Sequence, residues 1–295
     1  MLTGFFCVAG AATLLGILPT IQKQLMVDGL PLNSLMFYTN LTITVFCLLA
    51  IIIRKKSIRA TKQQIIQALL MGVFGMLFTA VLLNSSYLYL PVGTTIMLNF
   101  LYPTIVCVIM GVVFKNGFTK LQLAAIAGSI LGMMFLTGAG GDLSVFGMVL
   151  AIASAFTYGI YLVANEKGPV NSLPIEVKLF YVSLPATVVF SVVAPATNTI
   201  CAPQGGALSW ILLIGGSGMF TVGGYFLMMY GISKLGASTA AFVSMLEPIV
   251  SVVFSTFWFK DPVTLGIVAG GLLVMTSILL ITIDGYQKSK AEEAN

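Results

Sequence analysis

Two distant stretches of the chain repeat the same pattern. A Leu-Tyr-Pro motif at Leu101 is followed by an apolar span, a Phe-Lys pair and Thr119; a Leu-Glu-Pro motif at Leu246 is followed in the same way by Phe-Lys and Thr264. Matching residues lie 145 positions apart. The repeated unit holds an odd number of apolar spans, so its second copy must be inverted in a bilayer. Inverted repeats are characteristic of secondary transporters.

The composition indicates that the chain is embedded in a membrane. It is 58% hydrophobic and only 8% charged, with a mean hydropathy of +1.05, whereas ordinary globular proteins are about 25% charged. A bilayer span needs about 20 apolar residues, and such spans use nearly all of the 295 positions. We therefore expect no soluble catalytic domain. The N-terminus becomes apolar without a basic region before it, which predicts a retained helix rather than a signal peptide.

Several kinds of chemistry are excluded by the residues that the sequence lacks. It contains no histidine, which removes Ser-His-Asp and Cys-His catalysis and histidine-bound metals. Its four cysteines have no metal-ligand spacing. It has no phosphate-binding Gly-x-x-x-x-Gly-Lys motif, so ATP is not expected to drive it. We predict a protein that is not an enzyme and that needs no cofactor or metal.

The predicted fold is an all-α integral membrane protein with ten transmembrane helices, arranged as two inverted five-helix repeats. The repeats are expected at residues 1–140 and 145–295, the second with a short cytoplasmic tail. Gly16-Ile17 and Gly159-Ile160 extend the match to the first helix of each repeat. The ten predicted spans are 3–26, 32–53, 64–88, 92–114, 119–137, 145–165, 175–196, 208–232, 237–259 and 263–283.

The basic residues predict the orientation of the chain. With both termini in the cytoplasm, only Lys23 and Lys260 of the fourteen Lys and Arg residues fall outside, and cytoplasmic loops favour basic residues. We therefore predict a multi-pass protein of the inner cell membrane with cytoplasmic N- and C-termini. The net charge of +5 is interpreted as this topology signal and not as a nucleic-acid surface. The residues expected inside are Arg54, Lys55, Lys56, Arg59, Lys62, Lys115, Lys120, Lys167, Lys178, Lys234, Lys288 and Lys290.

Glu247 is the carboxylate nearest the middle of a predicted span. An ionisable group there costs about 2.5–3.5 kcal/mol on insertion scales, which makes it a functional candidate. It could meet a cationic or amine-bearing substrate, or take up a coupling proton because desolvation favours its neutral form. Alternatively, it could bond backbone groups freed by Pro248 and be structural. The sequence leaves both interpretations open.

Glu247 belongs to a helical face of small and polar residues. The first repeat has a similar face at the corresponding positions. We expect the two faces to meet across a central cavity. The first comprises Ala240, Ser244, Glu247, Ser251 and Ser255, and its counterpart Thr95, Asn99, Tyr102 and Val106.

Two other helices carry polar faces that could line the same cavity or bond neighbouring helices. They comprise Thr13, Gly16, Thr20 and Lys23 in the first span, and Ser154, Tyr158, Tyr161 and Asn165 in the sixth.

Three further features have open interpretations. Lys23 could extend to the outer interface, pair with Asp28 or bind a substrate carboxylate. Asn84, Ser85 and Tyr87 could line the external mouth of a pathway or cap the third span. Small residues at four-residue spacing in the fifth and tenth spans could pack within the chain or form a homodimer.

The pattern resembles the EamA branch of the drug/metabolite transporter (DMT) superfamily over essentially the whole chain. The resemblance rests on Gly16 to Lys23, Tyr158-Gly159, Leu246-Glu247-Pro248 and Phe259-Lys260 with Thr264. It implies a central cavity formed by helices one to four and six to nine, with five and ten outside. It also implies alternating-access transport, often export, of amino acids, nucleosides, amines or related metabolites.

The chain departs from the family pattern at two kinds of position. Leu15 stands where the family often has Trp, and Lys115-Asn116 and Lys260-Asp261 stand where it often has Glu. These departures leave the substrate open.

The leading hypothesis is a secondary transporter, an exporter, of a small organic metabolite such as an amino acid or amine, with proton coupling through Glu247. The second is an uncoupled facilitator or exchanger in which Glu247 is structural. A membrane scaffold that transports nothing is the third. The partners expected are a small-molecule substrate, a coupling proton and the lipid bilayer, and no nucleic acid.

Overall fold

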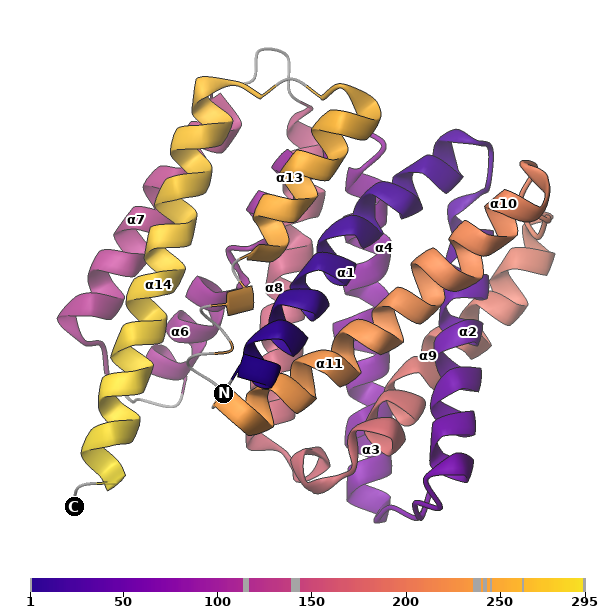
Figure 1. Ribbon diagram of the computed structural model, residues 1–295, viewed down its shortest axis with the longest axis horizontal. Coiled ribbons are helices and arrows are strands. Elements are labelled where there is room, and N and C mark those ends of the chain that lie inside the picture. Colours follow the sequence, from indigo (N-terminus) through magenta and orange to yellow (C-terminus); the bar gives the residue numbers. More distant parts are fainter. Residues whose placement is uncertain are drawn as a thin grey trace.

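The computed structural model is a bundle of tilted helices (Figure 1). It describes residues 2–113, 117–138, 144–235, 240, 243–244, 246–261 and 263–293. Within these residues, eight helical spans are long and apolar enough to cross a membrane, and two shorter apolar helices, Lys120–Leu136 and Leu246–Phe259, accompany them. The all-helical membrane architecture predicted from the sequence is confirmed.

The helices of the first half fill five spans. They are α1 (Leu2–Val27), α2 (Leu32–Ile53), the continuous series α3 (Lys62–Leu70), η1 (Met71–Leu77) and α4 (Phe78–Ser86), the pair α5 (Val92–Asn99) and α6 (Tyr102–Val112), and α7 (Lys120–Gly138).

The second half repeats this series. It comprises α8 (Val145–Lys167), the short 3-10 helix η2 (Pro169–Ser172), α9 (Ile175–Ala196), the series α10 (Gly206–Trp210), η3 (Ile211–Met219) and α11 (Phe220–Leu235), then α13 (Leu246–Phe259) and α14 (Leu265–Glu293). Of the span predicted at 237–259, residues 237–239, 241–242 and 245 lie outside the described residues, as do Phe114 and Lys115 of the repeated motif.

The span predicted at 92–114 is two helices because a proline interrupts it. Pro103 has no backbone N–H, so the carbonyl of Asn99 has no helical donor. The chain tightens there: Leu101 N donates to Leu98 O at 3.2 Å, and regular bonding resumes where Ile105 N donates to Leu101 O at 3.1 Å. The break lies at mid-span, where irregular backbone is tolerated if it lines a cavity.

The contacts between helices show that the two halves are related by a two-fold operation. α1 packs on α11 and α13, and its counterpart α8 packs on α4, α5 and α6. α2 packs on α9, and α7 packs on α14, so each of these pairs joins equivalent helices. The wide π-helical turns η1 and η3 also occur at corresponding places in the third and eighth spans.

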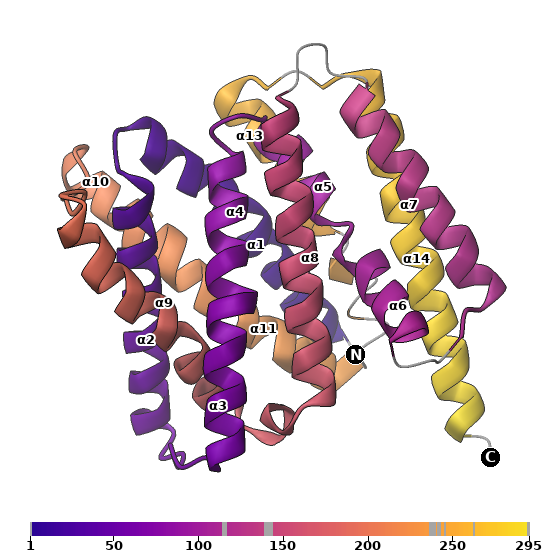
Figure 2. The same ribbon diagram turned by 180° about the vertical axis from the view of Figure 1, so that it is seen from behind.

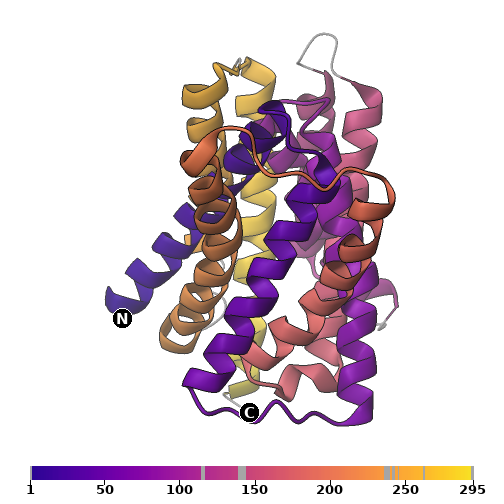
Figure 3. The same ribbon diagram turned by 90° about the vertical axis from the view of Figure 1, so that its right-hand side faces the viewer.

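The direction of the helices shows that the second half is inverted. α1 runs upward from the start of the chain to its turn into α2 (Figure 1), whereas α7 ends and α8 begins at the upper end, from which α8 runs down (Figure 2). The start of α1, the end of α14 and the α2–α3 connection all lie in the lower half of the bundle (Figure 3).

The small residues of α7 and α14 pack on each other within the chain. A Cβ placed on Gly132 would lie 2.9 Å from the carbonyl oxygen of Gly270, and one on Gly270 would lie 2.7 Å from that of Gly132. The two backbones are therefore in direct contact, and these faces are used inside the chain. A homodimer through the remaining faces of the two helices is still a prediction.

Two glycines lie at matching helix crossings. A Cβ on Gly16 of α1 would lie 2.7 Å from the carbonyl oxygen of Glu247, and one on Gly159 of α8 would lie 3.2 Å from the side chain of Ile105. The α1–α13 crossing is the tighter of the two and holds the start of α13 in place.

We predict that Gly16→Ala destabilises the protein by about 1–3 kcal/mol, because the added methyl group meets backbone that cannot move aside easily. Gly10→Ala on the same helix is the matched control, since its Cβ would meet only the end of Leu227 at 3.8 Å. Thermal unfolding of the two purified variants checks this. Equal midpoints for both variants would contradict the tight crossing.

Candidate substrate site

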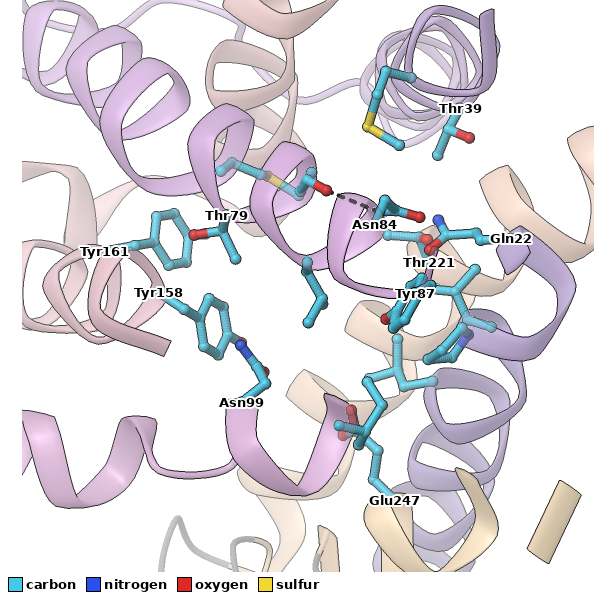
Figure 4. A pocket seen from close by; sticks show the side chains of 18 of the residues that line it. Gln22, Thr39, Thr79, Asn84, Tyr87, Asn99, Tyr158, Tyr161, Thr221 and Glu247 are labelled. Atoms are coloured by element: carbon cyan, nitrogen blue, oxygen red, sulfur yellow. Dashed lines mark hydrogen bonds between the residues drawn. The ribbon is translucent and has the colours of Figure 1, made fainter. Parts of the chain in front are cut away.

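A cavity of about 200 Å³ lies between the two repeats at the level of the α5–α6 break. Its wall comes from both halves of the chain, and Figure 4 shows the side chains that point toward it. The lining residues are Leu15, Leu18, Pro19, Gln22, Met36, Thr39, Asn40, Ile43, Met76, Thr79, Ala80, Leu83, Asn84, Tyr87, Ile96, Asn99, Phe100, Tyr102, Tyr158, Tyr161, Thr221, Tyr225 and Glu247.

Five of the nine residues proposed from the sequence lie together in this wall: Asn99, Tyr102, Tyr158, Tyr161 and Glu247. They come from α5, α6, α8 and α13, so each repeat contributes.

The other four residues proposed from the sequence lie outside the lining. Thr20 and Ser251 are fully buried, and their hydroxyls have no hydrogen-bond partner among the described residues. Ser244 is partly buried just before α13. Lys23 lies near the end of α1, beyond the cavity wall. A direct substrate contact by any of these four remains a prediction.

Lys23 is held by other groups. Its Nζ donates to the carbonyl of Leu90 at 3.3 Å and lies 4.9 Å from the ring centroid of Phe259. Asp28 instead accepts a hydrogen bond from Gln24 at 2.6 Å, so the Lys23–Asp28 ion pair considered from the sequence is not formed. Lys23 thus joins α1 to the connection before α5.

One wall of the cavity is aromatic. The rings of Tyr102 and Tyr158 meet edge to face with centroids 4.8 Å apart, and those of Tyr158 and Tyr161 are stacked at 5.9 Å. Tyr225 of α11 adds a fourth ring. Ring faces carry partial negative charge and attract cations. This wall therefore favours an organic group with a positive charge.

Glu247 supplies the carboxyl group of the cavity. It stands in the first turn of α13, and its side chain extends toward the space bordered by Asn99 and Tyr87 (Figure 4). Its carboxylate has neither an ion pair nor a hydrogen bond within the described part of the chain. No Lys or Arg is among the described residues that line the cavity. A carboxylate in this position lacks a protein counter-ion from those residues and can receive one from a ligand.

Asn99 is fixed by a chain of hydrogen bonds to α8. Its Nδ2 donates to Ser154 Oγ at 2.9 Å, and Ser154 Oγ donates to the carbonyl of Ala151 at 2.6 Å. Ser154 is fully buried. The end of α5 is thereby fastened to the helix that carries the tyrosines.

The polar residues of α1 and α2 in the wall were not identified from the sequence. Gln22 Nε2 donates to Ser217 Oγ at 3.1 Å, and the hydroxyls of Ser217 and Thr39 are 2.7 Å apart. A signal existed in α2, where the polar residues Thr39 and Asn40 follow each other inside an apolar span. The other residues missed in this way are Thr79, Thr221 and Tyr225.

Comparison with known proteins gives the same family for both halves. The sequence profile of the EamA-like transporter family matches residues 2–138 and again residues 145–283. A crystal structure of a protein with 16% sequence identity has a TM-score of 0.65 and covers 96% of this chain and 98% of its own. At that identity the likeness concerns the fold alone.

Curated relatives are named as transporters without an assigned substrate. An uncharacterized transporter of Synechocystis sp. is 28% identical over 229 residues, 75% of this chain and 68% of its own. The uncharacterized transporter YvbV of Bacillus subtilis is 28% identical over 216 residues, 70% of this chain and 67% of its own.

We predict that Ser154→Ala lowers stability by about 1 kcal/mol and weakens ligand binding, because Asn99 loses its acceptor. Ser191→Ala is the matched control, since Ser191 also bonds a carbonyl in its own helix, that of Val188 at 2.7 Å, but faces outward. Thermal unfolding with and without ligand checks both effects. The role given to Ser154 is wrong if the two variants behave alike.

Proposed function

The chain belongs to the EamA-like transporter family and is a multi-pass membrane transporter, and from this premise we propose that it moves a small organic ammonium, an amine or amino acid, by alternating access. The observation that carries the proposal is the carboxylate of Glu247, which lies in a tyrosine-lined cavity whose described lining holds no basic side chain. The proposed binding residues are Glu247, Asn99, Tyr102, Tyr158 and Tyr161.

The energetics of an unpaired carboxylate support a cationic substrate. An ionised carboxylate away from water is unfavourable unless it is paired and hydrogen-bonded. A bound ammonium pairs with it, and the rings of Tyr102 and Tyr158 complete the contact through their faces. A carboxylate substrate without an ammonium group would instead repel Glu247.

The same carboxyl group offers a route for proton coupling. When the substrate leaves, a proton can neutralise Glu247, so that the empty cavity carries no net charge from this residue while it reorients. Substrate and proton then compete for one site and cross in opposite directions. With an inward proton gradient, this exchange exports the ammonium.

The difference between the two ends of the bundle supports alternating access. At the end that holds the α2–α3 connection, Gln67 Nε2 donates to the carbonyl of Ala164 at 2.7 Å and Gln67 Oε1 accepts from Val170 N at 2.9 Å. The corresponding position of the second repeat is Trp210. At that opposite end, a hollow of about 540 Å³ separates the end of α1 near Asp28 from the start of α10. The Gln67 end is thus tied to α8 by side-chain bonds, although it also borders a hollow of about 380 Å³, whereas Trp210 meets the ring of Tyr38 at 5.3 Å.

We propose that the bonded end is cytoplasmic, with both termini, in the inner membrane. The distribution of Lys and Arg supports this orientation. A homodimer through the lipid-facing sides of α7 and α14 is part of the same proposal.

We predict that Glu247→Gln reduces the binding and uptake of organic ammonium ions about tenfold or more, because a hydrogen bond to a charged group contributes ~1.5–3 kcal/mol. Glu176→Gln is the matched control, since Glu176 is a buried glutamate that pairs with Arg54 at 3.0 Å and does not line the cavity. A thermal-shift screen with amines, amino acids and nucleosides at two pH values finds the ligand, and flux in proteoliposomes follows.

Other outcomes would point elsewhere. Unchanged, pH-insensitive flux in Glu247→Gln would favour the uncoupled facilitator or exchanger with a structural Glu247. Failure of every solute to cross sealed vesicles would favour a scaffold.

We predict that Cys201, in the α9–α10 connection, reacts with a membrane-impermeant thiol reagent added outside intact cells. A cysteine placed at exposed Ser57, in a Cys201→Ser background, should react only after the cells are opened. Both are partly or fully exposed, so access depends on the side of the membrane. The reverse pattern would contradict the orientation.

A further inference from the structure

Asn84 and Tyr87 place two unpaired polar atoms in the cavity wall. They lie three positions apart at the end of α4, so they share a helical face. Both side chains are almost fully buried, at 2% and 1% exposure. Asn84 Nδ2 donates to the carbonyl of Ala80 at 3.0 Å, which leaves Oδ1 as the free atom. Asn84 Oδ1 and the Tyr87 hydroxyl have no hydrogen-bond partner among the residues described.

These atoms differ from the other polar groups around them. Gln22 and Thr39, in the same wall, are satisfied through Ser217. Seven buried side-chain atoms without a partner occur in the described chain, and the two on Asn84 and Tyr87 are those that line the cavity. Buried polar atoms in native proteins are normally bonded. Unpaired ones that face a binding cavity are therefore candidates for contact with the ligand.

Of the two unpaired groups, the Tyr87 hydroxyl lies near the carboxylate, and Asn84 lines the same cavity. Tyr87 is within electrostatic reach of Glu247, and Figure 4 shows Asn84 and Tyr87 on the side of the cavity opposite the pair Tyr158 and Tyr161. Three oxygen-bearing groups thus border one cavity: a carboxylate, an amide carbonyl and a hydroxyl that can also accept.

We propose that Glu247, Asn84 and Tyr87 together select a nitrogen that carries at least two N–H groups, so that the site takes primary ammonium and rejects quaternary ammonium. The inference rests on the proposed function and adds the chemistry of the nitrogen. One N–H pairs with the Glu247 carboxylate, and a second donates to Asn84 Oδ1 or to the Tyr87 oxygen.

The selectivity follows from the cost of leaving these oxygens without a donor. A trimethylated nitrogen keeps its charge and can still attract Glu247 and the tyrosine faces. It offers no donor, however, so Asn84 Oδ1 and the Tyr87 oxygen would stay unpaired and would lose access to water. Sites built to hydrogen-bond a group discriminate strongly against analogues that lack it.

The test uses 2-phenylethylamine and its N-methyl, N,N-dimethyl and N,N,N-trimethyl derivatives, which differ only at nitrogen. Dissociation constants are measured by calorimetry on the purified full chain. We expect wild type to bind the primary amine at least ~10-fold more tightly than the trimethyl compound. Asn84→Leu and Tyr87→Phe should each reduce this difference in affinity, mainly by weakening the binding of the primary amine.

Two variants control the interpretation. Tyr89→Phe removes a hydroxyl two positions away on a half-exposed ring that packs on Phe146 outside the cavity, and it should keep the wild-type ratio. Asn84→Asp keeps the size and the acceptor and should also prefer the primary amine. If Asn84→Leu does not fold, the test is the primary-to-trimethyl affinity ratio of Tyr87→Phe compared with that of Tyr89→Phe.

Each result bears on the inference. Equal affinity of wild type for the primary and trimethyl compounds would overturn the inference and leave the ammonium transporter standing. So would a ratio unaffected by both Asn84→Leu and Tyr87→Phe. If neither the series nor any primary amine in the wider screen binds wild type, the inference and the proposed function both fall.

Discussion

The exclusion of water from the bilayer core is the constraint on which this structure depends. Backbone groups in that core must bond within the chain, so each crossing is helical, and irregular backbone is confined to places that line a cavity. Pro103 creates such a place between α5 and α6. Because five crossings were duplicated, the second set is inverted and brings Glu247 to the position that corresponds to Tyr102. The two halves therefore share one cavity with unequal chemistry on its two sides.

This inequality gives the cavity its chemical character. A symmetric pair of carboxylates would bind a metal or share a proton, whereas one carboxylate opposite tyrosine rings suits a single organic cation. The tight α1–α13 crossing at Gly16 fixes the backbone of Glu247, and the Asn99–Ser154 bond fixes the facing helix end. The carboxylate is thus held by backbone packing while its side chain is left without a bond in the part of the chain that the structure describes.

The sequence predicted the helices well and the cavity wall in part, for physical reasons. Hydropathy places span ends because the bilayer imposes a length, and α2 and α9 begin and end where predicted. Repeat matching identified Asn99, Tyr102 and Glu247 because these residues lie on the N-terminal side of the two matching prolines. α1 was the failure: its predicted polar face contains Gly16 and Thr20, which pack against other helices, while Gln22 on a different face lines the cavity. A helix buried on several sides carries small and polar residues on all of them, so periodicity alone does not select the face that meets the ligand.

The central claim is that a proton neutralises Glu247 when the cavity is empty, and that an ammonium group neutralises it when the cavity is occupied. The most direct measurement is the number of protons released when a primary amine binds purified protein in weakly buffered solution. The account predicts about one proton per amine bound for wild type and none for Glu247→Gln. Tight binding to wild type without proton release, or equal release by both proteins, would contradict it.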